Sequence, residues 1–167
     1  MGYKMGADGL LDFSDCENDG EKLDQCWDYF VENLSNVEVV AFDDKLVRGF
    51  TEVSFEHIVS GSSNKFDAVL DHDIPFVECR AARLPLIAKV IKGELKSQVY
   101  RMSYRRGKKT TVRRVLTVIE IEHEYYVVVL DEAKDIYRIR TAFPASKGYY
   151  DRCIRGQGTN AGIWHKA

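Results

Sequence analysis

Residues 97–143, SQVYRMSYRRGKKTTVRRVLTVIEIEHEYYVVVLDEAKDIYRIRTAF, indicate the fold class. Four segments of this stretch are rich in Val, Ile, Tyr and Thr, as β-strands are: 98–104, 111–122, 125–130 and 136–143. The polar connections between them have hairpin length. None is long enough to hold a crossover helix, so the stretch predicts a four-stranded antiparallel meander.

The chain before this stretch predicts helices. Apolar residues recur at three- and four-residue steps from Leu23 to Leu34, which indicates an amphipathic helix over about 20–34. Ser54 can cap a short helix that places His57 at its third position. A further helix is expected to start at Pro85 and to end at Gly93, since these residue types favour those positions.

Helices followed by antiparallel strands are typical of an α+β domain in which the helices cover one face of the sheet. We therefore expect N-terminal helices packed on a C-terminal four-stranded antiparallel meander. The organisation that follows is an acidic N-terminal segment, 1–50, ahead of one compact unit, 51–167.

Composition indicates a single soluble domain. The chain has 167 residues, of which 45% are apolar and 30% charged. Its longest apolar run, Tyr125–Leu130, is too short to span a membrane, and the first residues lack the apolar core of a signal peptide. The four cysteines lie far apart without a Cys-x-x-Cys pair, which argues against structural zinc. We expect a cytoplasmic protein with no membrane partner, no metal and no cofactor.

Charge is divided unevenly along the chain. Residues 1–80 carry 6 basic and 18 acidic side chains, whereas residues 81–167 carry 18 basic and 8 acidic ones. Such a division suggests a polyanion as the partner of the second half, or an acidic segment that masks a basic surface. The alternative is that the two halves attract each other and only support the fold.

The last strand of the meander carries the polar side chains of greatest interest. Strict alternation along a strand would place Tyr137, Ile139, Thr141 and Phe143 on one face. Arg138, Arg140 and Ala142 would then lie on the other face. Taken alone, these arginines are equally well explained as solvated charges, and Thr141 as a residue favoured in strands.

Three pieces of sequence, in this order, resemble the phage-associated nucleases grouped with barnase, EndoU, the colicin ribonucleases and RelE. They are Phe55–Ile58, Arg80–Ile87, and Tyr126–Val129 followed by Ile139–Pro144. The resemblance covers about residues 54–156. It implies helices before a four-stranded antiparallel sheet, and a metal-independent endoribonuclease of phage or mobile-element toxin type, in which a 2′-hydroxyl attacks the adjacent phosphate.

This reaction requires a proton acceptor, a proton donor and fixed cations around the phosphorane. His57 is the best candidate for a proton role because histidine titrates near neutrality. Arg83, and Arg80 less strongly, could clamp phosphate oxygens through the planar guanidinium. Thr141, carried over from the similar strand motif, would bind the scissile phosphate or orient another group. The second proton-transfer group is not assigned.

A basic segment around and after the last strand could hold the RNA backbone and a stacked base. With Arg80, the expected substrate-binding residues are Arg138, Arg140, Lys147, Tyr150, Arg152 and Arg155. The expected partner is RNA, with tRNA as one candidate, together with an inhibitory protein. Two other functions remain open at this point: a non-catalytic module that binds nucleic acid or protein, and an inhibitor of host proteins whose acidic half mimics nucleic acid.

Overall fold

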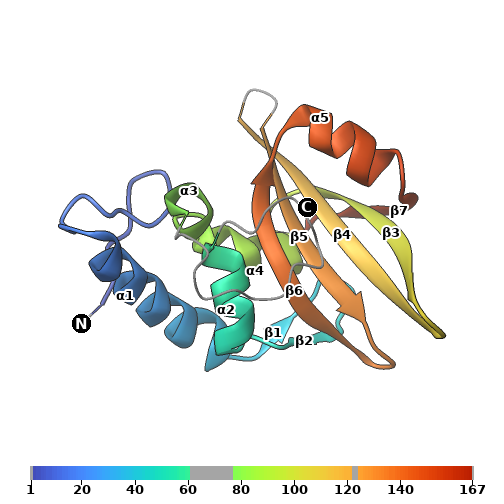
Figure 1. Ribbon diagram of the computed structural model, residues 1–167, viewed down its shortest axis with the longest axis horizontal. Coiled ribbons are helices and arrows are strands. Elements are labelled where there is room, and N and C mark those ends of the chain that lie inside the picture. Colours follow the sequence, from blue (N-terminus) through green and yellow to red (C-terminus); the bar gives the residue numbers. More distant parts are fainter. Residues whose placement is uncertain (1, 61–76, 122–123, 167) are drawn as a thin grey trace.

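The computed structural model describes residues 2–60, 77–121 and 124–166, which form a curled seven-stranded sheet with helices around it (Figure 1). The strands lie in the order β1-β2-β6-β5-β4-β3-β7. They are β1 (Val39–Val40), β2 (Leu46–Arg48), β3 (Ser97–Arg106), β4 (Lys109–Ile121), β5 (Glu124–Glu132), β6 (Ile136–Ala145) and β7 (Thr159–Trp164). The four segments expected from the sequence are β3 to β6, and each pairs antiparallel with the next.

The prediction of a four-stranded antiparallel meander is nevertheless wrong, because the sheet continues at both edges. β7 pairs antiparallel with β3, while β2 pairs parallel with β6 and makes the sheet mixed. β1 and β2 contain two and three residues, too few for a recognisable alternation. The first five residues of β7 are exposed or half-buried, so this edge strand lacks the apolar signal of a core strand.

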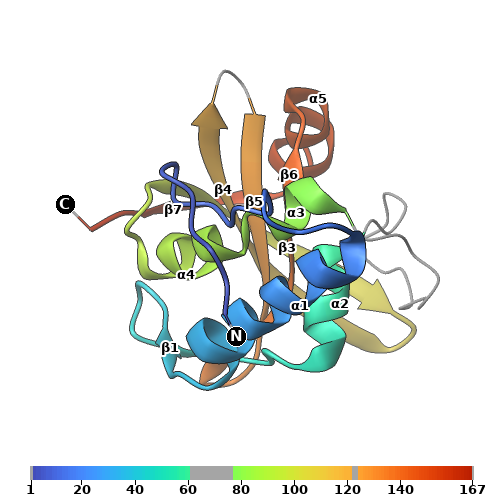
Figure 2. The same cartoon turned by 90° about the vertical axis from the view of Figure 1, so that its left-hand side faces the viewer.

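Helices lie on both faces of the sheet (Figure 2). The first group is α1 (Asp19–Phe30), its π-helical continuation η1 (Val31–Ser35), α2 (Glu52–Val59), α3 (Glu78–Ala81) and α4 (Leu84–Lys92). A second helical segment, α5 (Lys147–Tyr149) with η2 (Tyr150–Arg155), follows β6. The expectation that all helices cover one face is therefore wrong, because this short segment after the last predicted strand has its own apolar anchor, Ile154.

Two separate apolar cores reflect this arrangement. Val128 and Leu130 of β5 belong to the larger core, together with residues of α1, α2 and α4. Val127 and Val129, which point to the opposite face, pack with Ile154 in the smaller core. Residues 1–50 contribute Leu11, Phe13, Cys26, Phe30, Leu34, Val39, Ala41, Val47 and Phe50 to the larger core. The acidic segment thus shares its apolar interior with the rest of the molecule.

Helix α2 begins before the expected cap. Thr51 is the N-cap, and its side chain accepts a hydrogen bond from the backbone N–H of Ser54. Ser54 completes a capping box by bonding back to the Thr51 N–H, so it lies inside the helix at the third position. Phe55 and Ile58 are buried. Burial of these two residues fixes which side of α2 faces the core, and His57 is left half-buried between core and solvent.

Candidate functional site

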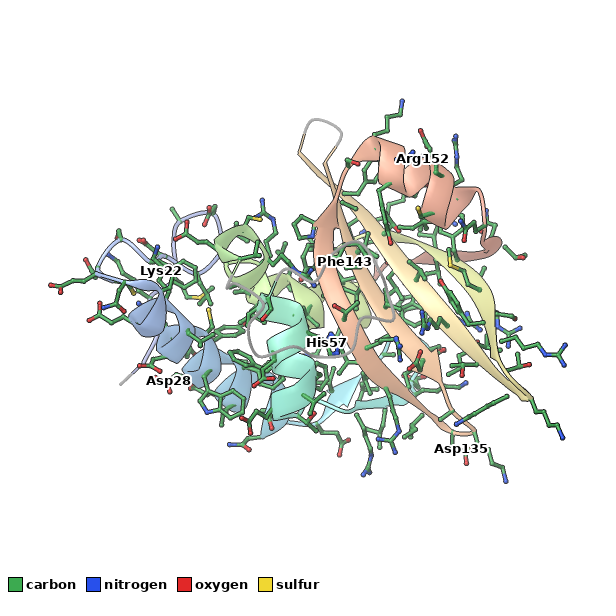
Figure 3. The ribbon with its side chains drawn as sticks, viewed as in Figure 1. Lys22, Asp28, His57, Asp135, Phe143 and Arg152 are labelled. Carbon is green, nitrogen blue, oxygen red and sulfur yellow. The ribbon has the colours of Figure 1, made fainter. Side chains whose placement is uncertain are left out.

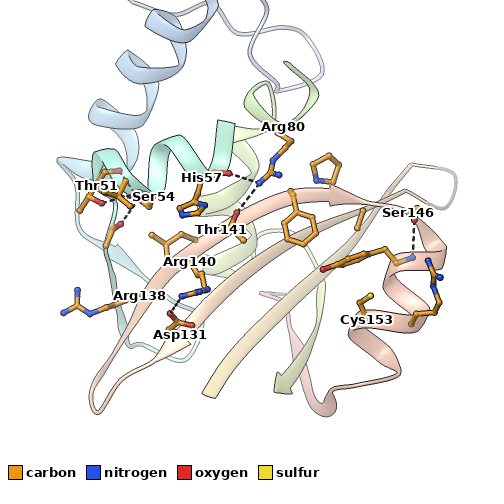
Figure 4. Close-up of a pocket in the computed structure, with 18 residues that line it drawn as sticks. Thr51, Ser54, His57, Arg80, Asp131, Arg138, Arg140, Thr141, Ser146 and Cys153 are labelled. Carbon is orange, nitrogen blue, oxygen red and sulfur yellow. Dashed lines mark hydrogen bonds and ion pairs between the residues drawn. The ribbon is translucent and has the colours of Figure 1, made fainter. Parts of the chain in front are cut away.

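A pocket of about 820 Å³ lies between α2, β6 and the α5–η2 segment (Figure 4). Six of the residues singled out from the sequence line it: His57, Arg80, Arg138, Arg140, Thr141 and Arg152. Four others do not: Arg83, Lys147, Tyr150 and Arg155. The pocket thus brings together side chains that are far apart in the sequence, with 95 positions between His57 and Arg152.

An irregularity in β6 places Thr141 in this pocket. Val129 of β5 pairs with Thr141, but the next residue, Leu130, pairs with Ile139, so Arg140 is an extra residue in β6. This bulge reverses the alternation of side chains after Ile139. The predicted face of Tyr137, Ile139, Thr141 and Phe143 is therefore wrong.

The consequence of the bulge is a polar face directed at the pocket. Tyr137 and Ile139 belong to the larger core, and beyond the bulge Ala142 takes the place there that alternation would have given to Thr141. Thr141 and Phe143 instead share the opposite face with Arg138, and all three line the pocket. One added residue therefore brings Thr141 and Phe143 onto the face of Arg138, and this face forms one wall of the site.

His57 points from α2 toward Arg140 and Thr141 (Figure 4). Within the described residues, its imidazole makes no hydrogen bond or ion pair. Burial lowers the pKa of His57 from its ordinary value near 6.5, and the positive charges of Arg140 and Arg80 lower it further, while Glu56 opposes them. These effects favour the neutral imidazole, which is the form that accepts a proton.

Arg80 connects α2 to the edge of β6. Its Nη2 donates to the backbone oxygen of His57 (2.8 Å), to Thr141 Oγ1 (3.2 Å) and to the Ala142 oxygen (3.4 Å). Its Nε donates to the Ile58 oxygen (3.1 Å). The carbonyls at the C-terminal end of α2 and the part of β6 that follows its pairing with β2 thus share one guanidinium. Burial lowers the pKa of Arg80, but an arginine starts so far above neutrality that it stays charged.

The order of importance expected for the two arginines is reversed in the structure. Arg83 lies three residues beyond Arg80, after the end of α3, and its Nη1 donates to the backbone oxygen of Cys79 (2.7 Å) outside the pocket. Arg80 lies within α3 and faces β6. Arg83 lies past the end of α3, at the N-cap of α4, so its side chain does not leave from the helix face that Arg80 occupies.

Arg140 is held by a carboxylate that the sequence did not suggest. Asp131 Oδ2 lies 3.4 Å from Arg140 Nη1, and Asp131 Oδ1 lies 3.2 Å from Nε of the buried Arg113. The Arg113 guanidinium also lies 3.9 Å from the ring centroid of Tyr104. Asp131 was expected in a hairpin connection, but β5 extends through Glu132. The extension places this carboxylate opposite Arg138, on the pocket face.

The far end of the pocket is aromatic. Phe143 and Tyr149 line it, and their rings contact edge to face with centroids 5.6 Å apart. The expected stacking residue, Tyr150, is instead used inside the protein: its ring stacks on Tyr125 at 4.4 Å, and its hydroxyl lies 2.6 Å from that of Tyr100. The tyrosine at the pocket is therefore the neighbour of the one expected from the sequence.

The remaining expected substrate ligands lie on the outer surface of the α5–η2 segment. Lys147 is exposed, and Arg155 pairs with Asp151 at 3.2 Å. Arg152 is also exposed, and its Nε donates to the Gly148 oxygen (3.2 Å) at the rim of the pocket.

Gly49 lines this pocket, but the acidic side chains of residues 1–50 do not. Figure 3 shows Asp28 on the helical side of the molecule and Arg152 beyond the sheet, with His57 and Phe143 between them. Throughout the described ranges, the ion pairs of acidic residues in 1–50 are with Lys4 and Lys22. None of these acidic residues pairs with a pocket arginine, so the idea of an acidic cover over the basic half has no contact to support it among the described residues.

In residues 2–60, 77–121 and 124–166, no three His, Cys, Asp or Glu side chains are grouped so as to hold a metal ion. No helix in those ranges has the length and apolar character needed to cross a bilayer. His72 and His123 lie outside the described residues.

Comparison with protein-family models, with curated proteins and with solved structures gives no match for this chain.

Proposed function

We propose that this protein is a metal-independent endoribonuclease that cleaves RNA by attack of a 2′-hydroxyl on the adjacent phosphate. The observation that carries the proposal is one pocket in which a half-buried imidazole lies beside two arginines and a threonine hydroxyl. These groups supply the proton acceptor and the fixed cations that the reaction needs, because the hydroxyl must lose a proton while the phosphorane gains negative charge.

In the proposed mechanism, His57 acts as the general base. Its imidazole takes the proton of the 2′-hydroxyl as the O2′–P bond forms and the P–O5′ bond breaks. The products are a 2′,3′-cyclic phosphate and a 5′-hydroxyl, whose oxygen takes up a proton from solvent. A base whose pKa lies below neutrality is already deprotonated at pH 7 and needs no activation by a further carboxylate.

Arg140 and Arg80 are proposed to bind the phosphate. Asp131 fixes the Arg140 guanidinium at the floor of the pocket without removing its charge. Among the described residues, Arg80 uses Nε and Nη2 for its protein bonds, which leaves its Nη1 for a phosphate oxygen. Fixed cations of this kind stabilise the phosphorane more than the ground state, because negative charge accumulates there.

Thr141 is proposed to hydrogen-bond a phosphate oxygen. Its Oγ1 already accepts a bond from Arg80 at 3.2 Å. A hydroxyl has only one proton, and acceptance from Arg80 directs that proton away from the guanidinium. The proton is therefore available to a phosphate oxygen placed between Thr141 and Arg140.

The biological setting proposed for this activity is a phage or mobile-element toxin that acts on RNA in the cytoplasm, with tRNA as one candidate substrate. An enzyme of this kind requires restraint in the cell that produces it, which suggests an inhibitory partner protein.

The test is RNA cleavage in the presence of EDTA, with the product ends identified by mass spectrometry. We expect the wild-type protein to leave 2′,3′-cyclic phosphates and His57→Ala to lose ~10²-fold or more of the rate. His165→Ala is the matched control, because His165 is an exposed histidine outside the pocket, and it should cleave like the wild type.

Three outcomes would contradict the proposal: equal cleavage by His57→Ala, cleavage abolished by EDTA, or no cleavage by the folded wild-type protein. Binding of RNA without any cleavage would favour the alternative of a non-catalytic binding module. A 2′-deoxy substitution at the cleaved position provides a further control, since it removes the attacking hydroxyl and must stop the reaction.

A further inference from the structure

We propose that the aromatic end of the pocket, formed by Phe143 and Tyr149, binds an unpaired nucleobase next to the scissile phosphate. The inference rests on the proposed function and deepens it, because it identifies the substrate as single-stranded or looped RNA. It assigns a base-binding role to two residues that the sequence did not single out as site residues.

The two ends of the pocket differ in chemistry. Near α2 the lining is cationic, with Arg80, Arg138 and Arg140, whereas near η2 it contains the Phe143 and Tyr149 rings with Pro144 and Ala145, and Arg152 lies at the rim. A nucleotide also has two chemically different ends, an anionic phosphate and a flat base. The match gives the nucleotide one orientation, with its phosphate at His57 and its base toward η2.

The rings are built into the protein and joined to the phosphate end. Phe143 lies on β6 two residues after Thr141, and its ring centroid is 5.6 Å from the guanidinium carbon of Arg80. Tyr149 meets Phe143 at an interplanar angle of 86°, so the two rings form a corner and not a flat surface. A base lying on one ring would meet the edge of the other. Both rings are half-buried, which limits the freedom that binding must remove.

The shape of the pocket selects against a duplex. In an A-form helix the bases are stacked and paired, and only phosphates, 2′-hydroxyls and groove edges are accessible. A base can enter a pocket bounded by α2 on one side and η2 on the other only after it leaves the stack. The volume of about 820 Å³ lies within the range of small-ligand sites and suits a nucleotide, not a helix.

The test uses a single-stranded 2′-O-methyl oligonucleotide that carries 2-aminopurine, together with its duplex form. The probe cannot be cleaved, because it has no free 2′-hydroxyl. On binding of the single strand, we expect 2-aminopurine fluorescence to be quenched by stacking, and we expect much weaker binding and no quenching with the duplex.

Variants then assign the effect to the two rings. Phe143→Leu and Tyr149→Leu retain apolar volume but lose a ring, and each should weaken binding by roughly 5- to 150-fold, the range for one stacked base. Tyr149→Phe keeps the ring and should bind like the wild type. Tyr150→Phe is the matched control, because its ring packs against Tyr125 outside the pocket.

Binding without quenching by the wild-type protein, equal affinity for the duplex, or full binding by both leucine variants would overturn the base site. The wild-type quenching measurement needs no variant, so it decides the question even if a substitution prevents folding. The base site and the nuclease proposal can fail independently. If the protein quenches the probe but never cleaves unmodified RNA, the base-site proposal stands and the nuclease proposal is wrong. If the protein cleaves RNA but never quenches the probe, only the base-site proposal is wrong.

Discussion

Replacement of Arg80 by alanine is expected to affect both the stability of the fold and the chemistry of the pocket. The guanidinium donates to the oxygens of His57, Ile58 and Ala142 and to Thr141 Oγ1, at distances from 2.8 to 3.4 Å. Alanine leaves these acceptors without their donor and removes the link between α2 and β6. His57 would lose the contact that fixes the end of its helix against the strand.

The magnitude follows from these bonds. Hydrogen bonds from a charged donor contribute about 1.5–3 kcal/mol each, and counting only the two shortest gives a loss of about 3–6 kcal/mol. For a domain of this size, 1 kcal/mol lowers Tm by about 2–4 °C, so we expect a decrease of roughly 6–24 °C. Arg80→Lys retains the charge but not the planar fork, and its loss should be smaller.

Arg83→Ala is the matched control because it changes the same residue type three positions away and outside the pocket. Its bond to Cys79 is local and does not join α2 to β6, so we expect a smaller loss than for Arg80→Ala. Urea denaturation gives the free energy of unfolding, and cleavage is measured where each variant is folded. Equal destabilisation by the two substitutions would refute the linking role of Arg80. Full RNA cleavage by folded Arg80→Ala would refute its role in phosphate binding.

Three further predictions concern the pocket and the backbone. Arg140→Gln removes a positive charge beside His57, so the pKa of His57 should rise and the low-pH limb of kcat/KM should move to higher pH; unchanged limbs would contradict the cause assigned to the shift. Thr141→Val keeps the shape but not the hydroxyl, and should cost about 1 kcal/mol of stability and at least ~10-fold in kcat, read from single-turnover rates. Gly93→Ala should cost about 1–3 kcal/mol in denaturation, because the backbone has φ +80° and the added Cβ would lie 2.7 Å from an aromatic ring carbon. Gly107→Ala, with φ +58° and open space, should cost less.

Long, strongly patterned segments could be predicted from the sequence. The apolar stripe from Leu23 to Leu34 corresponds to α1 and η1, and Gly93 ends α4 in the left-handed conformation. The four β-rich segments correspond to β3–β6. In each case the signal is local, because periodicity and capping depend on residues within one element.

Features set by contacts between distant segments could not be predicted. β2 is defined by its parallel pairing with β6 and not by its three residues. The bulge at Arg140 follows from how β6 aligns with β5, and no residue type in β6 indicates it. That single shift decides which face of β6 Thr141 occupies. The sequence therefore singled out Thr141 but could not predict that its side chain faces the pocket.

The sequence also could not decide between neighbouring residues of one type. Arg80 and Arg83 both suit a phosphate, and Tyr149 and Tyr150 both suit a base. Helix orientation assigns Arg80 and Tyr149 to the pocket, and it depends on how α3 and the α5–η2 segment pack against the sheet. Spacing along the chain alone does not contain that information.

General-base catalysis by His57 is tested most directly by measuring its pKa and the pH dependence of cleavage in the same protein. The imidazole is followed by NMR from about pH 4 to 9, and kcat/KM for RNA cleavage is measured over the same range. We predict one shared midpoint below 6.5, with the rate rising as His57 loses its proton and then remaining level through neutral pH. A rate that falls as His57 deprotonates, or that rises with a midpoint unrelated to the His57 titration, would contradict this role.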